Sequence, residues 1–288
     1  HLLTAFASAA TLAACTPAAE PPSEPPAEEA VAEALPLHVA VLDCGTIKIS
    51  DLDAFSSAGD YAGQPDEFTD TCYVVHHPKG ILLWDLGLPG ILKEGGPITQ
   101  DIFTVSLNET ITDQLAELGL TPADVNYFAI SHSHFDHIGQ VDQVKGSTWL
   151  VHQTELDFMI PPDGSAPQTS ADQVAQFSLF KDIKREAFTG EKDVFGDGSV
   201  VIFETPGHTP GHTSLQLKMP ESGYVLLTGD LYHRSESRPL TRVPRFNYNE
   251  EQTLASMAAF EKRAADLGAK VIIQHEPADI APLGGMIR

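Results

Sequence analysis

The sequence has few basic residues. Its 288 residues include 17 Lys and Arg against 40 Asp and Glu, which gives a formal net charge of −23 at pH 7. A surface of this sign repels phosphate backbones, so nucleic acid is excluded as a partner. The charge otherwise favours solubility. With 42% hydrophobic residues, the chain can bury the core of one large domain or two small ones.

A hydrophobic run long enough to cross a bilayer is missing from the N-terminus. The apolar residues 1–15 fall short of the roughly 20 that a membrane span needs, and we interpret them as a secretory signal peptide. The sequence "LAAC" resembles the lipobox of bacterial lipoproteins, which implies cleavage before Cys15 and a lipid on its sulfur. Residues 16–36, rich in Pro, Glu and Ala, are predicted to be a disordered tether. These segments together predict export in a Gram-negative bacterium to the periplasm, with a lipid anchor in the outer membrane.

Cysteine is also scarce, with three in the chain. Apart from Cys15, the remaining pair, Cys44 and Cys72, lie in apolar runs with strand character. An oxidising compartment would permit a disulfide between them, but a buried free thiol is equally ordinary in such runs. We expect free thiols.

Residues 37–288 contain no Pro- or Gly-rich break and no fixed repeat, so they are predicted to form one domain. Hydrophobic periodicity predicts the elements. The expected strands are 37–44, 71–77, 80–87, 125–131, 199–207, 213–219, 224–230 and 270–276, and the expected helices are 108–119 and 250–268. Asn108 is the expected N-cap of the first helix. Groups of strands, each followed by helices, predict an α/β fold in which two sheets pack together with helices outside.

Histidine and aspartate are concentrated in "SHSHFDHIG", residues 131–139, directly after a predicted strand. Side chains two apart in extended chain point the same way, so His132 and His134 can bind one metal ion together. Asp136 and His137 are consecutive, where the chain turns towards a helix, and are directed to a second ion. Imidazole and carboxylate are ordinary ligands of divalent metals.

Further candidate ligands follow later hydrophobic strands. "ETPGHTPGHTS" contains His208 and His212, "LLTGD" ends in Asp230, and "VIIQHEP" contains His275. Strands that end at one edge of a sheet bring such residues together. A structural zinc site closes with four ligands, often cysteine, whereas this set shared between two ions leaves positions open for water and substrate.

In this order, the motifs resemble those of the metallo-β-lactamase-fold hydrolases, and the resemblance covers about residues 37–288. It implies a four-layer αββα sandwich and two divalent ions, most often zinc, with iron, manganese or cobalt as alternatives. The implied ligands are His132, His134 and His208 for the first ion, Asp136, His137 and His275 for the second, and Asp230 as a bridge between them.

Other polar residues receive lesser roles. The resemblance implies that Asp85 orders the loop that carries His132 and His134 without binding metal. It also implies that His212 lies next to the metal ligands without binding metal itself. His76, His77 and His152 are expected to be surface or hairpin residues.

The chemistry that these ligands imply is hydrolysis of an ester, lactone or amide by a metal-bridging hydroxide. A metal ion can lower the pKa of water from 15.7 to about 7, so no serine or cysteine nucleophile is needed. The same ions would stabilise the oxyanion. Asp136 is the candidate to pass a proton to the leaving oxygen.

Within the family, the segments "HSHFDHIGQ", "TPGHTPGHTSL" and "LLTGDLYH" most resemble those of the N-acyl homoserine lactone lactonases, which are quorum-quenching enzymes. That branch often has a tyrosine three positions after the bridging aspartate. Here His233 holds that position and Tyr232 precedes it, so either could assist the substrate carbonyl. The segments 155–162 and 98–107 carry hydrophobic residues that are candidates for a lid, ordinary core packing or homodimer contacts.

Other activities of the same fold remain open. A carboxylesterase, an organophosphate hydrolase or a β-lactamase would use the same ligands with a different pocket. A thioesterase that binds glutathione would require Arg and Lys, in which the chain is poor. The flavodiiron branch replaces the second histidine of the first motif, where this chain keeps His134. A protein that only sequesters metal would not need open coordination positions. The preferred substrate is a small neutral lactone or ester.

Overall fold

The structure, a computed structural model, describes residues 36–288 and consists of two β-sheets with helices outside them. The predicted signal peptide, Cys15 and the tether up to residue 35 lie outside the described residues. The nine-stranded sheet contains, in spatial order, β4 (Ile98–Gln100), β5 (Phe103–Ser106), β1 (His38–Ile49), β2 (Asp66–His77), β3 (Gly80–Trp84), β6 (Tyr127–Ala129), β7 (Thr148–His152) and β8 (Arg185–Phe188), with β14 (Met286–Ile287) paired to β1. The five-stranded sheet contains β13 (Lys270–Ile272), β12 (Gly223–Leu227), β11 (Thr213–Met219), β10 (Val200–Glu204) and β9 (Lys192–Asp193).

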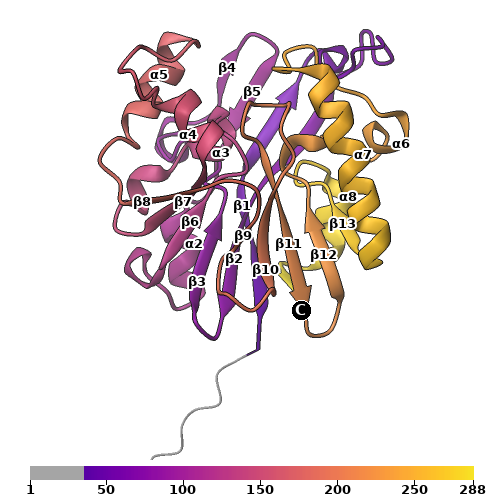
Figure 1. The fold of residues 1–288 in the computed structure, drawn as a ribbon. Coiled ribbons are helices and arrows are strands. Elements are labelled where there is room, and N and C mark those ends of the chain that lie inside the picture. The colour runs from indigo at the N-terminus through magenta and orange to yellow at the C-terminus, as the bar shows by residue number, and fades with distance from the viewer. Residues whose placement is uncertain (1–35) are drawn as a thin grey trace, which may run out of the picture. The chain divides into compact units, whose positions relative to one another are not determined.

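Helices cover the outer face of each sheet (Figure 1). The α-helices are α1 (Leu92–Gly95), α2 (Ile111–Glu117), α3 (Phe135–Ile138), α4 (Gln153–Met159), α5 (Ala171–Ser178), α6 (Ser237–Leu240), α7 (Glu250–Leu267) and α8 (Pro277–Ile280). The 3-10 helices are η1 (Leu52–Phe55), η2 (Pro122–Asp124), η3 (Val141–Gln143), η4 (Gly229–Leu231) and η5 (Ala281–Leu283). Among the helices of residues 36–288, none combines the length and apolar character that a membrane crossing requires.

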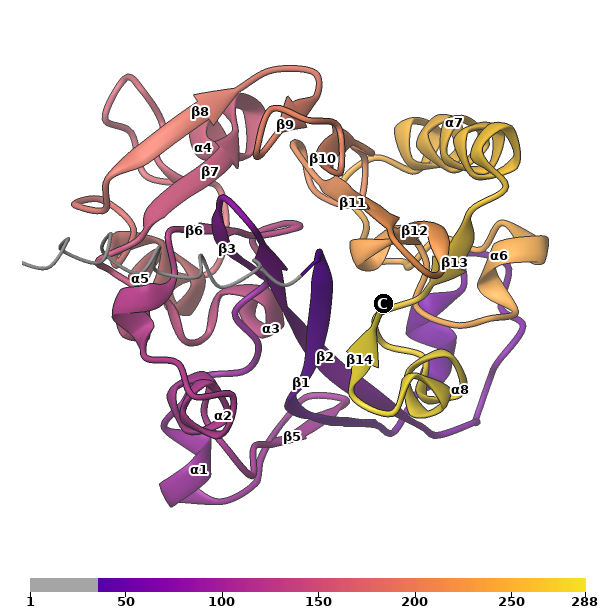
Figure 2. The same cartoon turned by 90° about the horizontal axis from the view of Figure 1, so that it is seen from below.

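Three apolar interfaces define four layers. Between the sheets, Trp84 and Leu82 pack in one cluster with Leu215 and Leu227 of the opposite sheet. Outside the nine-stranded sheet, residues of α2 to α5 such as Ile111 join a second cluster. Outside the five-stranded sheet, residues of α7 pack on β10 and β12. Figure 2 shows the two sheets side by side between these helices. The predicted αββα sandwich is confirmed.

The predicted elements are present, with different ends. The two predicted helices correspond to α2 and α7, and α7 begins after Asn249 and ends at Gly268. The N-cap of α2 is Thr110 rather than Asn108, because Thr110 and Asp113 form a reciprocal capping box. The very short strands, such as β4 and β9, carry too few residues for a periodic signal.

The expectation of free thiols was wrong, since Cys44 and Cys72 form a disulfide. Both residues are fully buried, and their Cα atoms are 5.8 Å apart. The antiparallel register of β1 and β2 pairs Leu42 with Cys72 and shifts between Asp43 and Gly45. This bulge brings Cys44 next to its partner, and a bulge cannot be located from hydrophobic alternation alone.

Candidate metal centre

The first candidate ligands lie on the loop between β6 and α3. The backbone N–H of Ser131 donates to Oδ1 of Asp85 at 2.5 Å, which fixes the start of this loop. Asp85 itself has a φ of 61°, an uncommon backbone conformation for a residue other than glycine. The predicted ordering role of Asp85 is therefore matched by its contacts.

The end of α3 is held by a close backbone approach. A Cβ atom on Gly139 would lie 2.3 Å from the carbonyl carbon of Leu88, so a larger residue would push α3 away. The N–H of Gly139 donates to the carbonyl of Gly87, and the N–H of Leu86 donates to the carbonyl of His137. This packing sets the position of the short helix that carries Asp136 and His137.

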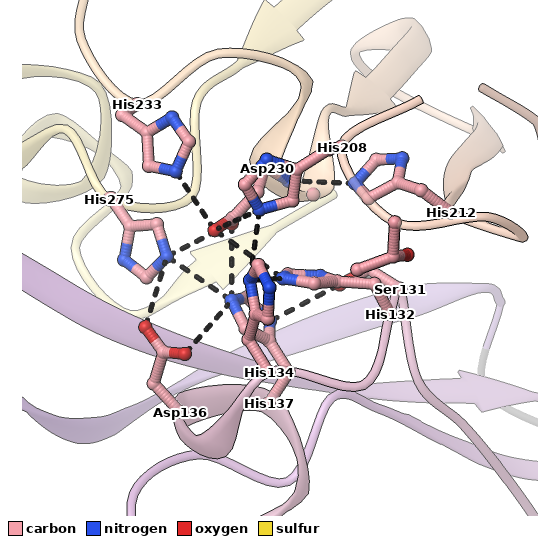
Figure 3. Close-up of polar contacts among 12 residues, drawn as sticks. Ser131, His132, His134, Asp136, His137, His208, His212, Asp230, His233 and His275 are labelled. Carbon is pink, nitrogen blue, oxygen red and sulfur yellow. Dashed lines mark hydrogen bonds and ion pairs between the residues drawn. The ribbon is translucent and has the colours of Figure 1, made fainter. Parts of the chain in front are cut away.

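The remaining candidates come from the five-stranded sheet. His208 follows β10, Asp230 lies in η4 after β12, and His275 follows β13. Figure 3 shows these side chains converging with those of the His132 loop. The structure therefore brings the predicted residues from both sheets to one place.

The side chains form two groups of potential metal-binding atoms, and within each group the atoms lie within 4.8 Å of one another. The first group is His132, His134, His208 and Asp230, and the second is Asp136, His137 and His275. Nδ1 of His134 lies 2.9 Å from Nε2 of His132 and 3.0 Å from Nε2 of His208. Nε2 of His137 and Nε2 of His275 are 3.2 Å apart.

Asp230 lies between the two groups. Its Oδ2 is 3.6 Å from Nε2 of His132 and 3.5 Å from Nε2 of His208. Its Oδ1 is 3.1 Å from Nε2 of His137 and 3.0 Å from Nε2 of His275. One oxygen thus faces each group, as a bridging carboxylate would.

The electrostatics of the site call for added positive charge. The carboxylates in and around the two groups are all buried, and none is paired with Lys or Arg among residues 36–288; they are Asp70, Asp85, Asp136, Glu155 and Asp230. Burying unpaired charges of one sign is costly. Two divalent cations would neutralise most of this charge, so the donor set fits such a pair.

Burial and the neighbouring carboxylates shift the pKa values of the histidines in opposite directions. Burial lowers the pKa of His132 and of His134 well below the ordinary value. For His275, burial lowers the pKa, but the carboxylate of Asp230 outweighs it and raises the pKa to about 9. His137 behaves in the same way beside Asp230, Asp85 and Asp136, and its pKa is raised well above the ordinary value. Protons on these two rings supply positive charge that bound cations would replace.

Two residues that support the site, Gln274 and Glu155, were not identified by the sequence analysis. Gln274 donates from Nε2 to Oδ2 of Asp85 at 2.8 Å, and its Oε1 accepts from Trp84 Nε1 and from the N–H of Gly229. Glu155 accepts hydrogen bonds from the His132 loop and from the turn after His208. An amide before a histidine and an acid in the first turn of a helix are common sequence features, so neither carried a signal.

His212 lies outside both groups. Its Nε2 accepts the N–H of Asp230 at 3.0 Å, and its Nδ1 lies 3.0 Å from the carbonyl of Thr205. Burial lowers the pKa of His212 to about 3, which keeps the ring neutral for this acceptor role. His212 therefore supports the backbone at Asp230 from outside the two groups, as the resemblance implies.

Tyr232 and His233 point in different directions. The hydroxyl of Tyr232 donates to Oε1 of Glu261 on α7 at 3.0 Å, so the expectation that it could assist the substrate is corrected. The ring of His233 lines the cavity, with Nε2 3.0 Å from Oδ2 of Asp230. Tyr232 follows η4 with an extended backbone, which places its side chain and that of His233 on opposite sides, and sequence spacing did not reveal this.

His152 is also a correction. It was expected at the surface but is buried, and its side chain caps α4 by accepting from the N–H of Thr154. Its Nε2 lies 2.7 Å from Oε1 of Glu204, so the imidazole is satisfied on both nitrogens. His76 and His77 end β2 at a hairpin and are half-buried, as expected.

A cavity of about 220 Å³ lies over the donor groups. It is lined by Phe55, Phe68, Phe103 and Phe246 together with several of the candidate ligands. A groove of about 440 Å³ adjoins it and shares Phe103, His134 and Phe135 with it. Much of the groove's lining is apolar, so the site can accept a substrate with a hydrophobic tail.

The two hydrophobic segments expected near the site have different roles. Phe103, in 98–107, lines both the cavity and the groove. The segment 155–162 begins within α4, which extends to Met159, and Met159 is buried in the core outside the nine-stranded sheet. Core packing is therefore the role of this second segment.

The chain resembles known proteins in sequence and in structure. The family model of the metallo-beta-lactamase superfamily matches residues 66–275. The N-acyl homoserine lactonase AttM of Azorhizobium caulinodans is 27% identical over 221 residues, which are 71% of this chain and 81% of the relative.

Solved structures share the fold at low identity. An N-acyl homoserine lactone hydrolase with N-hexanoyl-L-homoserine bound at its catalytic metal centre has a TM-score of 0.71 at 23% identity, covering 85% of this chain and 95% of that chain. AidC, a dizinc quorum-quenching lactonase, has a TM-score of 0.64 at 18% identity, covering 87% and 89%. The matched segment contains every candidate metal ligand, and the chain belongs to the metallo-beta-lactamase superfamily.

Proposed function

We propose that this chain is a dinuclear-metal hydrolase that opens the ring of N-acyl homoserine lactones. The observation that carries the proposal is the carboxylate of Asp230, which faces two histidine groups beneath an apolar cavity. Relatives with the name N-acyl homoserine lactonase support the choice of substrate. The net charge of −23 supports a neutral substrate rather than an anionic one.

The residues that would hold the metals follow from the two groups. His132, His134 and His208 would hold the first ion and Asp136, His137 and His275 the second, with Asp230 shared. When bound, such ions lower the pKa of water to about 7 and polarise a carbonyl oxygen. We infer zinc, because a His and Asp donor set suits it and a dizinc lactonase shares the fold.

The chain's own residues would position and enclose the substrate. The rings of Phe55, Phe103 and Phe246 surround the cavity, and Phe55 contacts the other two at ring centroid distances of 6.2 and 5.2 Å. These rings exclude water and offer an apolar surface to an acyl chain, which the adjoining groove would continue.

Two polar groups at the cavity are placed to act on the substrate. Asp136 lines the cavity and can hold the proton that the leaving oxygen requires. His233 is the nearest counterpart of the tyrosine expected from the resemblance, and it would contact the substrate carbonyl.

A substrate panel tests this proposal. Chelator-treated protein is restored with zinc and assayed with acyl homoserine lactones of several chain lengths, a nitrophenyl ester, a phosphotriester and a β-lactam. We expect kcat/KM to be highest for the lactones and to fall to background after chelation. A higher kcat/KM for any other member of the panel would refute the lactone assignment.

We also propose that the chain is exported and anchored by a lipid on Cys15. The lipobox-like sequence supports this, and so does the buried disulfide, because disulfides persist in oxidising compartments such as the periplasm. Mass spectrometry of the protein from the membrane fraction is expected to find a lipid on Cys15, and Cys15→Ala should abolish both this lipid and the cleavage before residue 15. A parent protein without a lipid on Cys15 would contradict the anchor.

A further inference from the structure

Glu155 is a buried carboxylate between the two loops that carry the first group of candidate ligands. It lies in the first turn of α4 and is 2% exposed. Its Oε1 accepts the N–H of Ser133 at 2.8 Å. Its Oε2 accepts the hydroxyl of Thr209 at 2.9 Å and the N–H of Gly211 at 2.8 Å.

These three contacts join the two sheets at the site. Ser133 lies between His132 and His134 on the loop after β6, and Thr209 follows His208 on the turn after β10. The turn fits closely against α4, because a Cβ atom on Gly211 would lie 2.2 Å from the backbone nitrogen of Glu155. One side chain therefore joins the loop that carries His132 and His134 to the turn that follows His208.

The contacts also indicate the charge of Glu155. All three partners are donors, so the carboxylate form satisfies them, while a protonated acid would add a donor of its own. No Lys or Arg pairs with Glu155 among residues 36–288. A buried anion without a cationic partner is costly. A cation held by the histidines of the adjacent loops would offset this cost.

The second group is supported by different residues. Asp85 lies 3.0 Å from Nδ1 of His137, and the carbonyl of Thr69 lies 2.9 Å from Nδ1 of His275. Glu155 forms no hydrogen bond with this group. Ser131 contacts both groups, with its Oγ 3.0 Å from Nδ1 of His132 and 3.2 Å from Nδ1 of His137, whereas Glu155 contacts only the loops of the first group.

We propose that Glu155 is a positioning residue that sets the metal affinity of the first group selectively, through both its charge and its three hydrogen bonds. The inference rests on the dinuclear centre of the proposed function and extends it to a residue that contacts neither metal nor substrate. Residues that orient metal ligands typically change metal affinity by about 10- to 100-fold when they are replaced.

Glu155→Gln is the central variant, because it keeps the size of the side chain and removes its charge. Metal-free protein is titrated with zinc against a chromophoric chelator, without any substrate. We expect one of the two zinc equivalents to bind about 10- to 100-fold more weakly and the other to be unchanged. Glu204→Gln is the control for the same change of charge, since Glu204 is exposed, accepts from His152 and from the N–H of Gly190, and lies outside the site. It should leave both affinities at the parent values.

Two variants, each lacking a ligand of one group, identify which of the two metal positions Glu155→Gln weakens. His275→Ala leaves the first group complete, and adding Glu155→Gln there should reproduce the weaker binding. His208→Ala leaves the second group complete, and adding Glu155→Gln there should change nothing. Parent affinity for both equivalents, equal weakening of both, or loss in the second background alone would each overturn the proposal.

Thr209→Val decides the matter if Glu155→Gln does not fold. This variant removes one hydrogen bond and keeps the charge, so we expect the first affinity to fall about 3- to 10-fold. An unchanged affinity would then overturn the proposal. Absence of zinc binding by the parent protein would instead refute the dinuclear centre itself, so the two failures are distinguishable.

Discussion

Replacing both Cys44 and Cys72 with alanine would remove the cross-link between β1 and β2. The disulfide closes a loop with a sequence separation of 28 residues, which contains η1 and most of β2. In the unfolded chain this closed loop restricts the accessible conformations. The double variant should therefore unfold more easily, although its strand pairing in the native state is retained.

The size of the effect follows from the loop length. The chain-entropy relation for a closed loop of 28 residues gives a loss of about 3.6 kcal/mol in the free energy of unfolding at 25 °C. For a domain of this size, 1 kcal/mol corresponds to about 2 to 4 °C, so Tm should fall by about 7 to 14 °C. The lost packing of two fully buried sulfur atoms would add to this figure.

Thermal unfolding of the parent and the double variant, followed by circular dichroism at equal metal content, measures this loss. Mass spectrometry under non-reducing conditions establishes that the parent carries the disulfide. Because both cysteines are buried, mild reductant should leave the disulfide of the folded parent intact, so thermal unfolding is compared without reductant. A double variant that melts within about 2 °C of an oxidised parent would refute the reasoning.

Asp230→Asn should lower kcat/KM at least about 100-fold and reduce the amount of bound metal, while the fold persists. A hydrolysis assay with parallel elemental analysis measures both effects, and retained turnover would show that the bridging carboxylate is unnecessary. Tyr232→Phe should lower the free energy of unfolding by about 1 kcal/mol without changing kcat/KM. His233→Phe should lower kcat/KM about 10- to 100-fold. The reverse pattern would show that Tyr232 is the group that assists the substrate carbonyl. The Arg238 guanidinium lowers the pKa of Glu261 below its ordinary value of 4.5, so this pair stabilises the folded state above that pH and the contribution is lost as pH falls through the lowered pKa. The difference in the free energy of unfolding between the parent and Glu261→Gln, followed by thermal unfolding at several pH values, should thus be full at pH 7 and shrink below about pH 4. It should be at most about 1 kcal/mol throughout, because both side chains are partly exposed.

Much of the architecture could be predicted because it depends on hydrophobic periodicity. The long strands β10, β11 and β12 alternate or run apolar, and α7 has both a cap at Asn249 and an end at Gly268. Several short strands, such as β4, β5 and β9, lack a period and were missed, whereas β6 and β13 were found because the apolar runs around them are longer. The candidate ligands were found because four motifs that contain histidine or aspartate each follow a hydrophobic strand, in the order of the family.

The remaining features depend on three-dimensional contacts. Tyr232 and His233 are adjacent, and only the direction of the extended backbone after η4 decides which of them lines the cavity. The pairing of Cys44 depends on a bulge, and the burial of His152 depends on its contact with Glu204. Glu155 resembles any acid in a first helical turn until the loops that it contacts are known. In each of these cases the information lies in tertiary packing rather than in local sequence.

The candidate ligands are divided between the two sheets, with one set after β6 and the other after β10, β12 and β13. Cations bound by both sets would fasten the halves of the sandwich together, and unfolding would have to release them. At free metal 100 times the Kd, a single such position adds about 2.7 kcal/mol to the free energy of unfolding. Resistance to proteolysis, and with it the amount of the protein, should therefore rise and fall with the supply of metal.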